Sequence, residues 1–496
     1  MDQVTTEDAF VNSLKKPDPA KIVLRDQGRG ETTAMGSYMP HNTDQGSNAL
    51  HVVVVGAGIG GLSCAIACRR AQPPIAVTVV ERAPELLAIG AGIHIPPNAC
   101  RVMNHFGLVP KLKQAGGYLV QDFTLRRYQN GAVLAEKPLG ERMEREYGAE
   151  WIAIHRGDYQ NVLLEEALNS GVIIITDGEV TGIEDDWSSW QQVLSLKDGR
   201  KITADVVVGA DGLWSTLREH VLGRAFAPQE TGDLAYRGTF TQEQLRAFND
   251  PKIDKLMEAS NVQVWLGPDQ HAVFYPLRNH TEYNLVLLCA DDMPEGVRTS
   301  AGTVEEMAGL FNGWDPSLNK IISCLKSALK WKLLHFKELD KWTRGPVVLL
   351  GDASHPTLPY QGQGAAMAVE DGAILGLLLD RLQSRGLPTR PEERHSQLTS
   401  LLKLYEQMRK RRTEVNVAGA VLTRQFYHIS DGEGQIARDR ELSQMAGTRW
   451  QGESKWNWAD ASYQKSLLGF NVLTDAERRF DEWWGSGSQT ATQSVL

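Results

Sequence analysis

The chain has 496 residues, of which 42% are hydrophobic and 23% charged, as in an ordinary globular protein of roughly two or three domains. Its 61 acidic residues outnumber its 52 lysines and arginines, so the net charge is −9 and argues against nucleic acid or an anionic membrane surface as partner. No apolar run approaches the roughly 20 residues that a membrane-spanning helix requires. We therefore expect no membrane span and a cytoplasmic location.

The five cysteines are odd in number and sparse for this length, which is typical of small buried side chains in a reducing compartment. Cys64 and Cys68 fall on one face of a predicted helix, but no histidine or further cysteine stands beside them. Because a structural zinc site needs about four such ligands, we predict no metal site.

The amino-terminal part of the chain changes character abruptly near residue 50. Residues 1–48 are rich in Thr, Asp, Gly, Ser and Asn without a sustained period, which predicts a disordered leader. The β-branched run His51–Val55 predicts a strand buried on both faces. A helix is expected over 62–70 and a second strand over 77–80. Such a βαβ unit favours a parallel sheet and an α/β fold.

A glycine motif, Gly56-x-Gly58-x-x-Gly61, separates the first strand from the helix. The first glycine permits a tight turn, the second lets the backbone approach a pyrophosphate, and the third allows close helix–strand packing. The helix N-terminus directs its N–H groups at the phosphates. Glu81 and Arg82 close the second strand, where Glu81 is placed to accept hydrogen bonds from ribose hydroxyls. These features predict a dinucleotide site.

The rest of the chain suggests a second, smaller sheet inserted into the first domain. Strands are expected over 172–175 and 201–208. Short β-rich runs between residues 232 and 290 predict an antiparallel sheet. Helices are expected over 364–382 and 398–422.

Two buried strands run directly into glycine–aspartate junctions. One junction is Gly209-Ala210-Asp211-Gly212, and the other is Gly351-Asp352, which follows a strand predicted over 347–350. Together with the glycine motif, and in this order, they resemble the flavoprotein aromatic hydroxylases of the para-hydroxybenzoate hydroxylase fold, particularly their salicylate hydroxylase-like branch. The resemblance covers about residues 49–425 and implies FAD as the cofactor.

The resemblance also implies roles for single residues. The glycine motif would hold the ADP half of FAD, and the loop over 89–99 would pass near the ribityl chain and the flavin ring. Arg156 would contact FAD, and Asp352 would meet the ribityl hydroxyls. A helix N-terminus at Gly364 would favour the negative charge of the reduced flavin. We therefore expect the following cofactor-binding residues: Gly56, Gly58, Gly61, Glu81, Arg82, Gly92, His94, Arg156, Asp211, Asp352, Pro359, Gly364, Ala365 and Ala366.

The activity implied by the resemblance is a monooxygenase reaction. NADPH or NADH would reduce the flavin, O2 would add to it as a C4a-hydroperoxyflavin, and a phenolic or other electron-rich aromatic substrate would be hydroxylated. A base or cation near the phenolic oxygen is then expected. Arg237 and Tyr275 are the expected catalytic residues, and Tyr275 should face the side of its strand opposite to Phe274. The alternatives are a surface or interdomain salt bridge for Arg237 and an ordinary strand position for Tyr275.

Three further features have two interpretations each. His355 could relay a proton beside the flavin or fix its loop, and His94 has the same ambiguity, with covalent flavin attachment through a histidine also open. The segment 450–484 holds five tryptophans, which suggest either an aromatic contact surface or pocket lid, or a helical appendage packed on the main body. We favour the appendage.

Same-fold alternatives to hydroxylation are epoxidation, indole oxidation and hydroxylative decarboxylation, and the non-enzyme alternative is a dinucleotide-binding regulator. The sequence does not separate a monomer from a homodimer, or NADPH from NADH. We expect a Rossmann-like FAD-binding domain with an inserted antiparallel-sheet substrate domain and a C-terminal helical segment. The expected division is leader 1–48, FAD-binding domain 49–225 and 341–425, substrate domain 226–340, Trp-rich helical segment 426–484 and disordered tail 485–496.

Overall fold

The computed structural model describes residues 49–86, 90–325, 328–447 and 450–486. The predicted leader, 1–48, and residues 487–496 of the predicted tail lie outside the described residues. Among the described residues, no helix is both long enough and apolar enough to cross a membrane.

A mostly parallel sheet forms the centre of the α/β part, as predicted. Its β-branched strands are buried on both faces. Only β19 runs antiparallel to its neighbour. Across the sheet the strands are β19 (Thr343–Arg344), β20 (Val347–Leu349), β12 (Val206–Gly209), β1 (His51–Val55), β2 (Ala76–Val80) and β8 (Ile173–Ile175).

The sequence suggested one strand over 201–208, but the structure has two. β11 (Lys201–Ala204) joins a small antiparallel sheet, whereas β12 joins the parallel one. Asp205 stands at the break, where its carboxylate accepts hydrogen bonds from the His51 backbone N–H at 2.8 Å and the Gln191 side chain at 3.1 Å. The Asp205 backbone N–H also donates to the His51 carbonyl at 2.9 Å, so the chain passes from one sheet to the other at this residue, which the apolar pattern could not reveal. The small sheet has the order β11, β10 (Gln191–Leu196) and β9 (Val180–Asp186).

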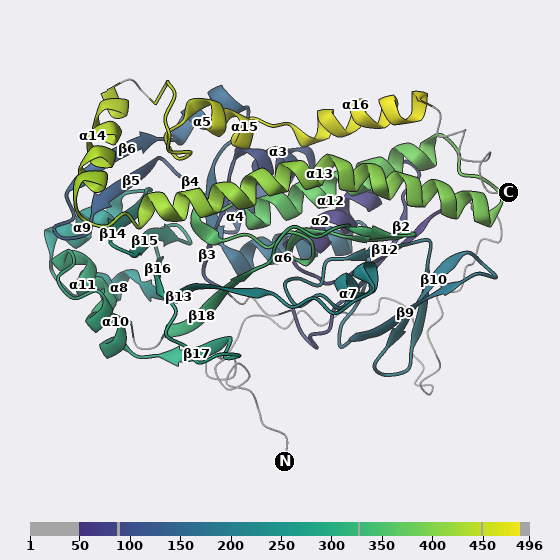
Figure 1. The fold of residues 1–496 in the computed structure, drawn as a ribbon, viewed down its shortest axis with the longest axis horizontal. Coiled ribbons are helices and arrows are strands. Elements are labelled where there is room, and N and C mark those ends of the chain that lie inside the picture. The colour runs from purple at the N-terminus through teal and green to yellow at the C-terminus, as the bar shows by residue number, and fades with distance from the viewer. Residues whose placement is uncertain (1–48, 87–89, 326–327, 448–449, 487–496) are drawn as a thin grey trace, which may run out of the picture.

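Helices α2 (Ile59–Arg69) and α12 (Gly364–Ser384) cross in close contact above the parallel sheet. Glycines make this approach possible, since a Cβ at Gly372 would lie 2.6 Å from the backbone nitrogen of Cys64. Helix α13 (Pro391–Tyr427) extends past both ends of the predicted helix and runs along the molecule beside α12, with α16 (Val472–Gly485) above it (Figure 1).

The second sheet is larger than the inserted domain predicted over 226–340. Strands β5 and β6 belong to it, although they come from the range assigned to the first part of the FAD-binding domain, because β5 pairs in parallel with β14. Only this long-range pairing assigns β5 and β6 to the second sheet. Across the sheet the strands are β17 (Thr299–Gly302), β18 (Ala328–His335), β13 (Gln229–Thr241), β16 (Glu282–Ala290), β15 (Gln270–Leu277), β14 (Val262–Gly267), β5 (Asp122–Arg127) and β6 (Val133–Pro138).

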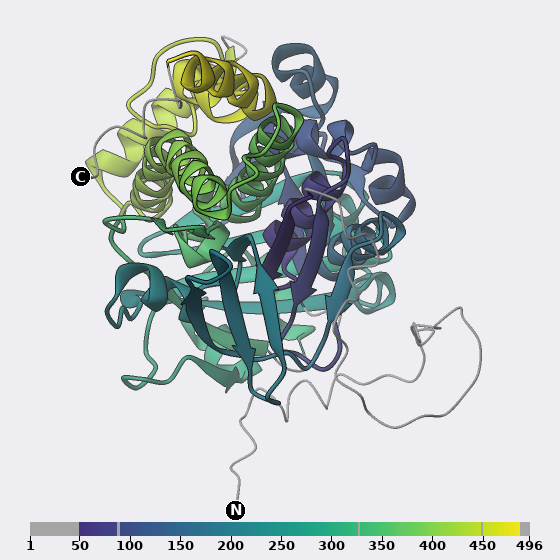
Figure 2. The ribbon, with the colours of Figure 1, turned by 90° about the vertical axis from the view of Figure 1, so that its right-hand side faces the viewer.

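A short third sheet accompanies the two large ones. Figure 2 views helices α12 and α13, in green, nearly end-on and shows the purple strands β1 and β2 along their length. The third sheet has the order β3 (Gly92–Ile95), β7 (Ile152–His155) and β4 (Tyr118–Leu119). The remaining helices are α3 (Pro97–His105), α4 (Val109–Gln114), α5 (Gly140–Tyr147), α6 (Arg156–Asn169), α7 (Thr216–Leu222), α8 (Gln242–Arg246), α9 (Pro251–Glu258), α10 (Val304–Leu310), α11 (Pro316–Ser323), α14 (Glu433–Gly447) and α15 (Ala461–Leu468).

The Trp-rich segment packs on the body at two places. Trp450 and Trp458 are buried in the core beneath the second sheet, and the Trp450 indole donates to the Glu136 carbonyl at 3.0 Å. Trp483 and Trp484 pack against the core of the parallel sheet through Phe480. These four tryptophans thus cover apolar surface of the two cores.

Gly372→Ala should destabilise the fold, because the added methyl group would meet backbone atoms of α2 that cannot move aside. We expect a loss of about 1–3 kcal/mol in the free energy of unfolding, measured by urea unfolding and circular dichroism. Gly309→Ala in α10 is the matched control, since nothing lies within 4 Å of its Cβ, and it should stabilise by up to about 1 kcal/mol. Equal stability of Gly372→Ala and wild type would contradict this packing.

Candidate active site

A cavity of about 480 Å³ opens between the carboxyl ends of the parallel strands and one face of the second sheet. Gly58 and Asp352, from motifs almost 300 residues apart, line the same cavity. Crevices at this edge of a parallel sheet are where such folds bind ligands. These predicted site residues line the cavity: Gly58, Gly61, Gly92, His94, Arg156, Arg237, Tyr275, Asp352, Pro359, Gly364 and Ala365. These do not: Gly56, Glu81, Arg82, Asp211 and Ala366.

Each glycine of the first motif meets a different structural requirement. Gly56 has a φ of +108°, and a Cβ there would collide with the Ala210 carbonyl. A Cβ at Gly61 would collide with the Gly56 carbonyl, so this glycine sets the helix–strand distance. A Cβ at Gly58 would meet nothing within 4 Å, because it would enter the cavity. The first and third glycines therefore shape the loop, and the second leaves room for a ligand.

Two of the predicted cofactor-binding carboxylates, Glu81 and Asp211, accept hydrogen bonds from backbone N–H groups. Glu81 accepts from the Ala57 and Ala83 backbone N–H groups, both at 2.9 Å, and so holds the glycine loop against β2. Asp211 accepts from the Leu217 backbone N–H at 3.1 Å, near the start of α7. Their contacts to a nucleotide remain predictions.

Arg156 and Asp352 both line the cavity, and their opposite charges attract each other. His155 caps α6 by accepting from the Gly157 backbone N–H at 3.2 Å, which places Arg156 at the first turn of the helix. Burial lowers the pKa of Arg156, and the nearby Asp352 carboxylate partly offsets this effect. Burial likewise raises the pKa of Asp352, and the nearby His355 and Arg156 partly offset this rise. The wall therefore offers a cation and a carboxylate to a polar ligand.

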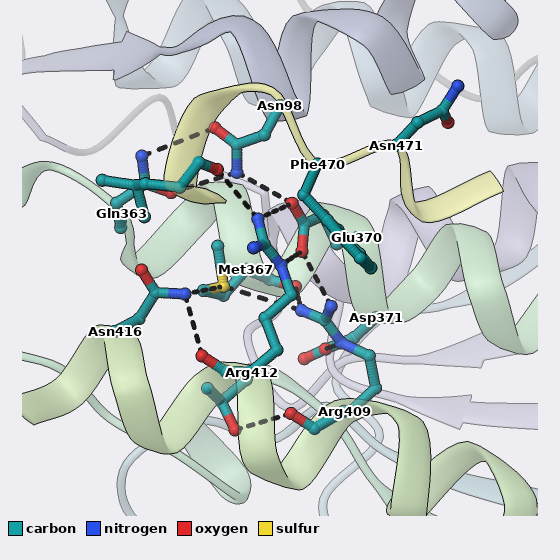
Figure 3. A network of polar contacts seen from close by, with 12 residues as sticks. Asn98, Gln363, Met367, Glu370, Asp371, Arg409, Arg412, Asn416, Phe470 and Asn471 are labelled. Carbon is teal, nitrogen blue, oxygen red and sulfur yellow. Dashed lines mark hydrogen bonds and ion pairs between the residues drawn. The ribbon is translucent and has the colours of Figure 1, made fainter. Parts of the chain in front are cut away.

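A buried ionic network fixes the loop that carries Asp352 (Figure 3). The side chains of Glu370, Asp371 and Arg409 are all fully buried. Arg409 donates to Asp371 at 2.6 Å and to Glu370 at 2.7 Å. Arg412 donates to Glu370 through two nitrogens, at 2.7 and 2.8 Å. Three helices meet here, because Asn98 of α3 also donates to Glu370, at 2.9 Å.

Asp371 connects this network to the loop. Its carboxylate accepts from the Gly351 backbone N–H at 2.9 Å and lies 2.6 Å from His355 Nε2. Burial alone would raise the pKa of Asp371, but His355, Arg409 and the Gly351 N–H outweigh it and lower the pKa to about 2. Since the carboxylate is then ionised, His355 Nε2 carries the hydrogen that it shares. His355 does not line the cavity, so the geometry favours its interpretation as the residue that fixes the loop.

Arg237 and Tyr275 meet on the sheet side of the cavity. Arg237 is partly buried, its Nε is buried and makes no hydrogen bond with the described residues, and no ion pair of its guanidinium is found among them. The alternative of an interdomain salt bridge is thus not realised within the described chain. Burial raises the pKa of Tyr275, and Arg237 opposes that shift. Phe274 packs on the other side of the sheet, as the strand alternation predicted.

Tyr275 is enclosed by Gly92 and His94. A Cβ at Gly92 would collide with the Tyr275 ring, and the His94 and Tyr275 rings lie 4.6 Å apart. His94 Nδ1 accepts from the Trp151 indole at 3.1 Å, and burial lowers the pKa of His94 to about 4. His94 is therefore neutral with its hydrogen on Nε2.

Sequence reasoning missed most of the apolar wall. The face of the second sheet supplies it, and the C-terminal segment closes it with Trp458, so the lid interpretation holds for this one tryptophan. His271 also lines the cavity and bonds His428 at 2.8 Å between ring nitrogens. Strand alternation around Tyr275 was the available signal for the strand residues. The missed wall residues include Phe123, Lys137, Trp151, Val262, Val264, His271, Val273, Val286, Leu288 and Tyr427.

Arg409→Met should destabilise the protein strongly, because Asp371 would lose its only arginine partner within the network while remaining buried. We expect a loss of about 3–5 kcal/mol in the free energy of unfolding, measured by urea unfolding. Arg411→Met, at an exposed position on the same helix, should change it by less than about 0.5 kcal/mol. Similar losses in the two variants would show that the network is not what stabilises this region.

Known proteins share both the sequence and the fold of this chain. A family model described as an FAD binding domain matches residues 49–414. An FAD-dependent monooxygenase, OpS4, from Beauveria bassiana is 36% identical over 86% of this chain and 96% of its own length. A 3-hydroxybenzoate 6-hydroxylase from Polaromonas naphthalenivorans is 30% identical over 85% of this chain and 96% of its own. A 6-hydroxynicotinate 3-monooxygenase from Pseudomonas fluorescens is 35% identical over 67% of this chain and 83% of its own.

The fold matches that of a solved salicylate hydroxylase in complex with its substrate. The TM-score is 0.69 at 22% identity, covering 87% of this chain and 98% of the other. The match agrees with the predicted fold, a nucleotide-binding α/β part with a second sheet and C-terminal helices. The chain therefore belongs to the FAD binding domain family, and it is an FAD-dependent monooxygenase.

Proposed function

We propose that this monooxygenase hydroxylates a phenolic or other electron-rich aromatic ring, with NADPH or NADH as electron donor and O2 as oxidant. The observation that carries the proposal is Arg237, a partly buried arginine beside Tyr275 whose buried Nε has no hydrogen-bond partner among the described residues. A guanidinium nitrogen that is buried without a partner is well suited to an anionic oxygen of a ligand. Aromatic substrates named for two relatives, a hydroxybenzoate and a hydroxynicotinate, support the same class.

The residues of the cavity fit FAD. Gly58 leaves open space at the start of α2, where the helix N-terminus favours a pyrophosphate. Arg156 and Asp352 offer a cation and a carboxylate for the polar middle of the cofactor. Gly364 and Ala365 bring the N-terminus of α12 to the cavity, where its positive end would favour negative charge on a reduced ring. Bound FAD supplies the transfer of electrons from NAD(P)H to O2.

The chain's own residues have three tasks in this reaction. Arg237 stabilises the ionised oxygen of the substrate and so makes the ring more nucleophilic. Tyr275, which burial keeps protonated, donates a hydrogen bond beside it. The valines and tryptophans of the wall exclude water from the reacting atoms.

A panel of phenols tests the proposal directly. The purified protein should be yellow, and its NAD(P)H oxidation should rise when a suitable phenol is added. Oxygen uptake and mass spectrometry should then identify a product carrying one added oxygen. Products of epoxidation or of hydroxylative decarboxylation would assign the alternative reactions. If a broad panel neither stimulates NAD(P)H oxidation nor yields an oxygenated product, hydroxylation of phenols is not the activity.

Gly58→Val should abolish FAD binding without unfolding the protein. The new side chain meets no protein atom at its Cβ but enters the space assigned to the pyrophosphate. We expect colourless protein whose urea unfolding midpoint matches that of the wild-type apoprotein. Gly223→Ala, at a helix end away from the cavity with nothing within 4 Å of its Cβ, should remain yellow. A yellow Gly58→Val variant would place the cofactor elsewhere.

Arg237→Met should impair turnover and leave the flavin spectrum unchanged. Losing a charge-assisted hydrogen bond costs about 1.5–3 kcal/mol, so kcat/KM for a phenol should fall about 10- to 100-fold. Arg246→Met, at an exposed position on α8, serves as the control and should keep wild-type kinetics. Unaltered turnover by Arg237→Met would remove this residue from the site.

A further inference from the structure

The floor of the cavity is one face of the second sheet, and its register places a cation at each end. Arg237 of β13 is opposite Val286, Val286 is opposite Val273, and Val273 is opposite Val264. Residues opposite one another in a ladder share a face. The floor thus runs from Arg237 across three valines.

The same face continues to the edge strand and ends at a lysine. Val262, two residues from Val264 and therefore on the same face, is opposite Phe123, and Phe123 is opposite Lys137 of β6. All of these residues line the cavity. From β13 to β6 the floor takes five steps of about 4.8 Å between strands, or about 24 Å along the sheet.

Lys137 is buried without an acidic partner. Its exposed fraction is 7%, and its Nζ donates to the Trp458 carbonyl at 2.9 Å. No carboxylate of the described residues forms an ion pair with it. The charged groups that influence it electrostatically are Arg142 and Glu146 of α5, and these pair with each other at 2.7 Å.

An ammonium in such a place needs an anion. Burial lowers the pKa of Lys137 to about 7, with a further contribution from Arg142, so the charged form is costly while the cavity holds no counter-charge. A neutral carbonyl and the ring of Trp458, 5.1 Å from Nζ, only partly replace the lost hydration. The position is therefore well suited to a ligand that brings a negative charge.

We infer that Lys137 binds an acidic group of the substrate that is remote from the ring being hydroxylated. The inference rests on the proposed function, since Arg237 and the flavin fix the reacting ring at the other end of the floor. The substrate is then an extended, largely apolar aromatic with a carboxylate or similar anion at its far end. The four valines and Phe123 between the two cations match the apolar middle of such a molecule.

Matched ligands and variants test this assignment in the FAD-loaded enzyme. The probes are phenols with a 4-alkyl chain of two to ten methylenes that ends in a carboxylate, and the corresponding primary amides. Affinity is measured from the change in flavin absorbance, and turnover from NAD(P)H oxidation. The variants are Lys137→Met, which removes the charge, and Lys137→Arg, which retains it. Lys197→Met, at a turn where the side chain is 73% exposed, is the control.

In the wild type, carboxylates of the matching chain length should bind about 10- to 100-fold more tightly than their amides. Lys137→Met should lose this preference and still bind the amides, while Lys137→Arg and Lys197→Met should keep it. If Lys137 had only a structural role, Lys137→Met would weaken the binding of acids and amides equally, and this result would overturn the inference. Equal binding of acids and amides by the wild type would overturn it too, yet leave the proposed function standing. If no phenol of either series binds, the proposed function itself fails.

Discussion

The buried ion pairs between α12 and α13 are the interaction on which the active site depends. Two adjacent carboxylates, Glu370 and Asp371, are fully removed from water and are balanced by Arg409 and Arg412. Removing such charges from water costs several kcal/mol per ion, so their attraction is large but the net gain is small. The main contribution of the network is to fix the positions of the elements that carry it, because every charged group in it has a partner. Three helices and one loop are thereby held in a single arrangement.

That arrangement explains how distant motifs form one cavity. Asp371 holds the Gly351 backbone and His355, so the loop with Asp352 cannot move independently of α12. The same helix brings Gly364 and Ala365 to the cavity at its first turn. The glycines between α2 and α12 set the distance from this helix to the first glycine motif. A cofactor contacting all three motifs thus meets one rigid frame.

The parts of this structure that follow from local sequence were predictable, and those that depend on long-range pairing were not. The βαβ unit with Gly56, Gly58 and Gly61 was visible because strand, turn and helix signals coincide there. The placement of β5 and β6 was not visible, because nothing within their own residues indicates pairing with β14. Lys137 escaped notice for the same reason, since an isolated lysine on an edge strand ordinarily faces water.

The roles of single residues divide in a similar way. Gly58, Arg156 and Asp352 were identified by motif and do line the cavity. Glu81 and Asp211 were identified by motif as well, but their carboxylates bond to backbone N–H groups of nearby loops and helices. A motif specifies that a carboxylate is needed at a strand end. It does not specify whether the ligand or the loop takes the hydrogen bond.

The position of Trp458 has a consequence for the synthesis and folding of the enzyme. This residue forms part of the cavity wall, and it lies beyond residue 414, where the match to the family model ends. The cavity wall can therefore be completed only after the ribosome has synthesised the chain as far as Trp458. A chain that stops at residue 414 would carry the three glycine motifs but lack this part of the wall.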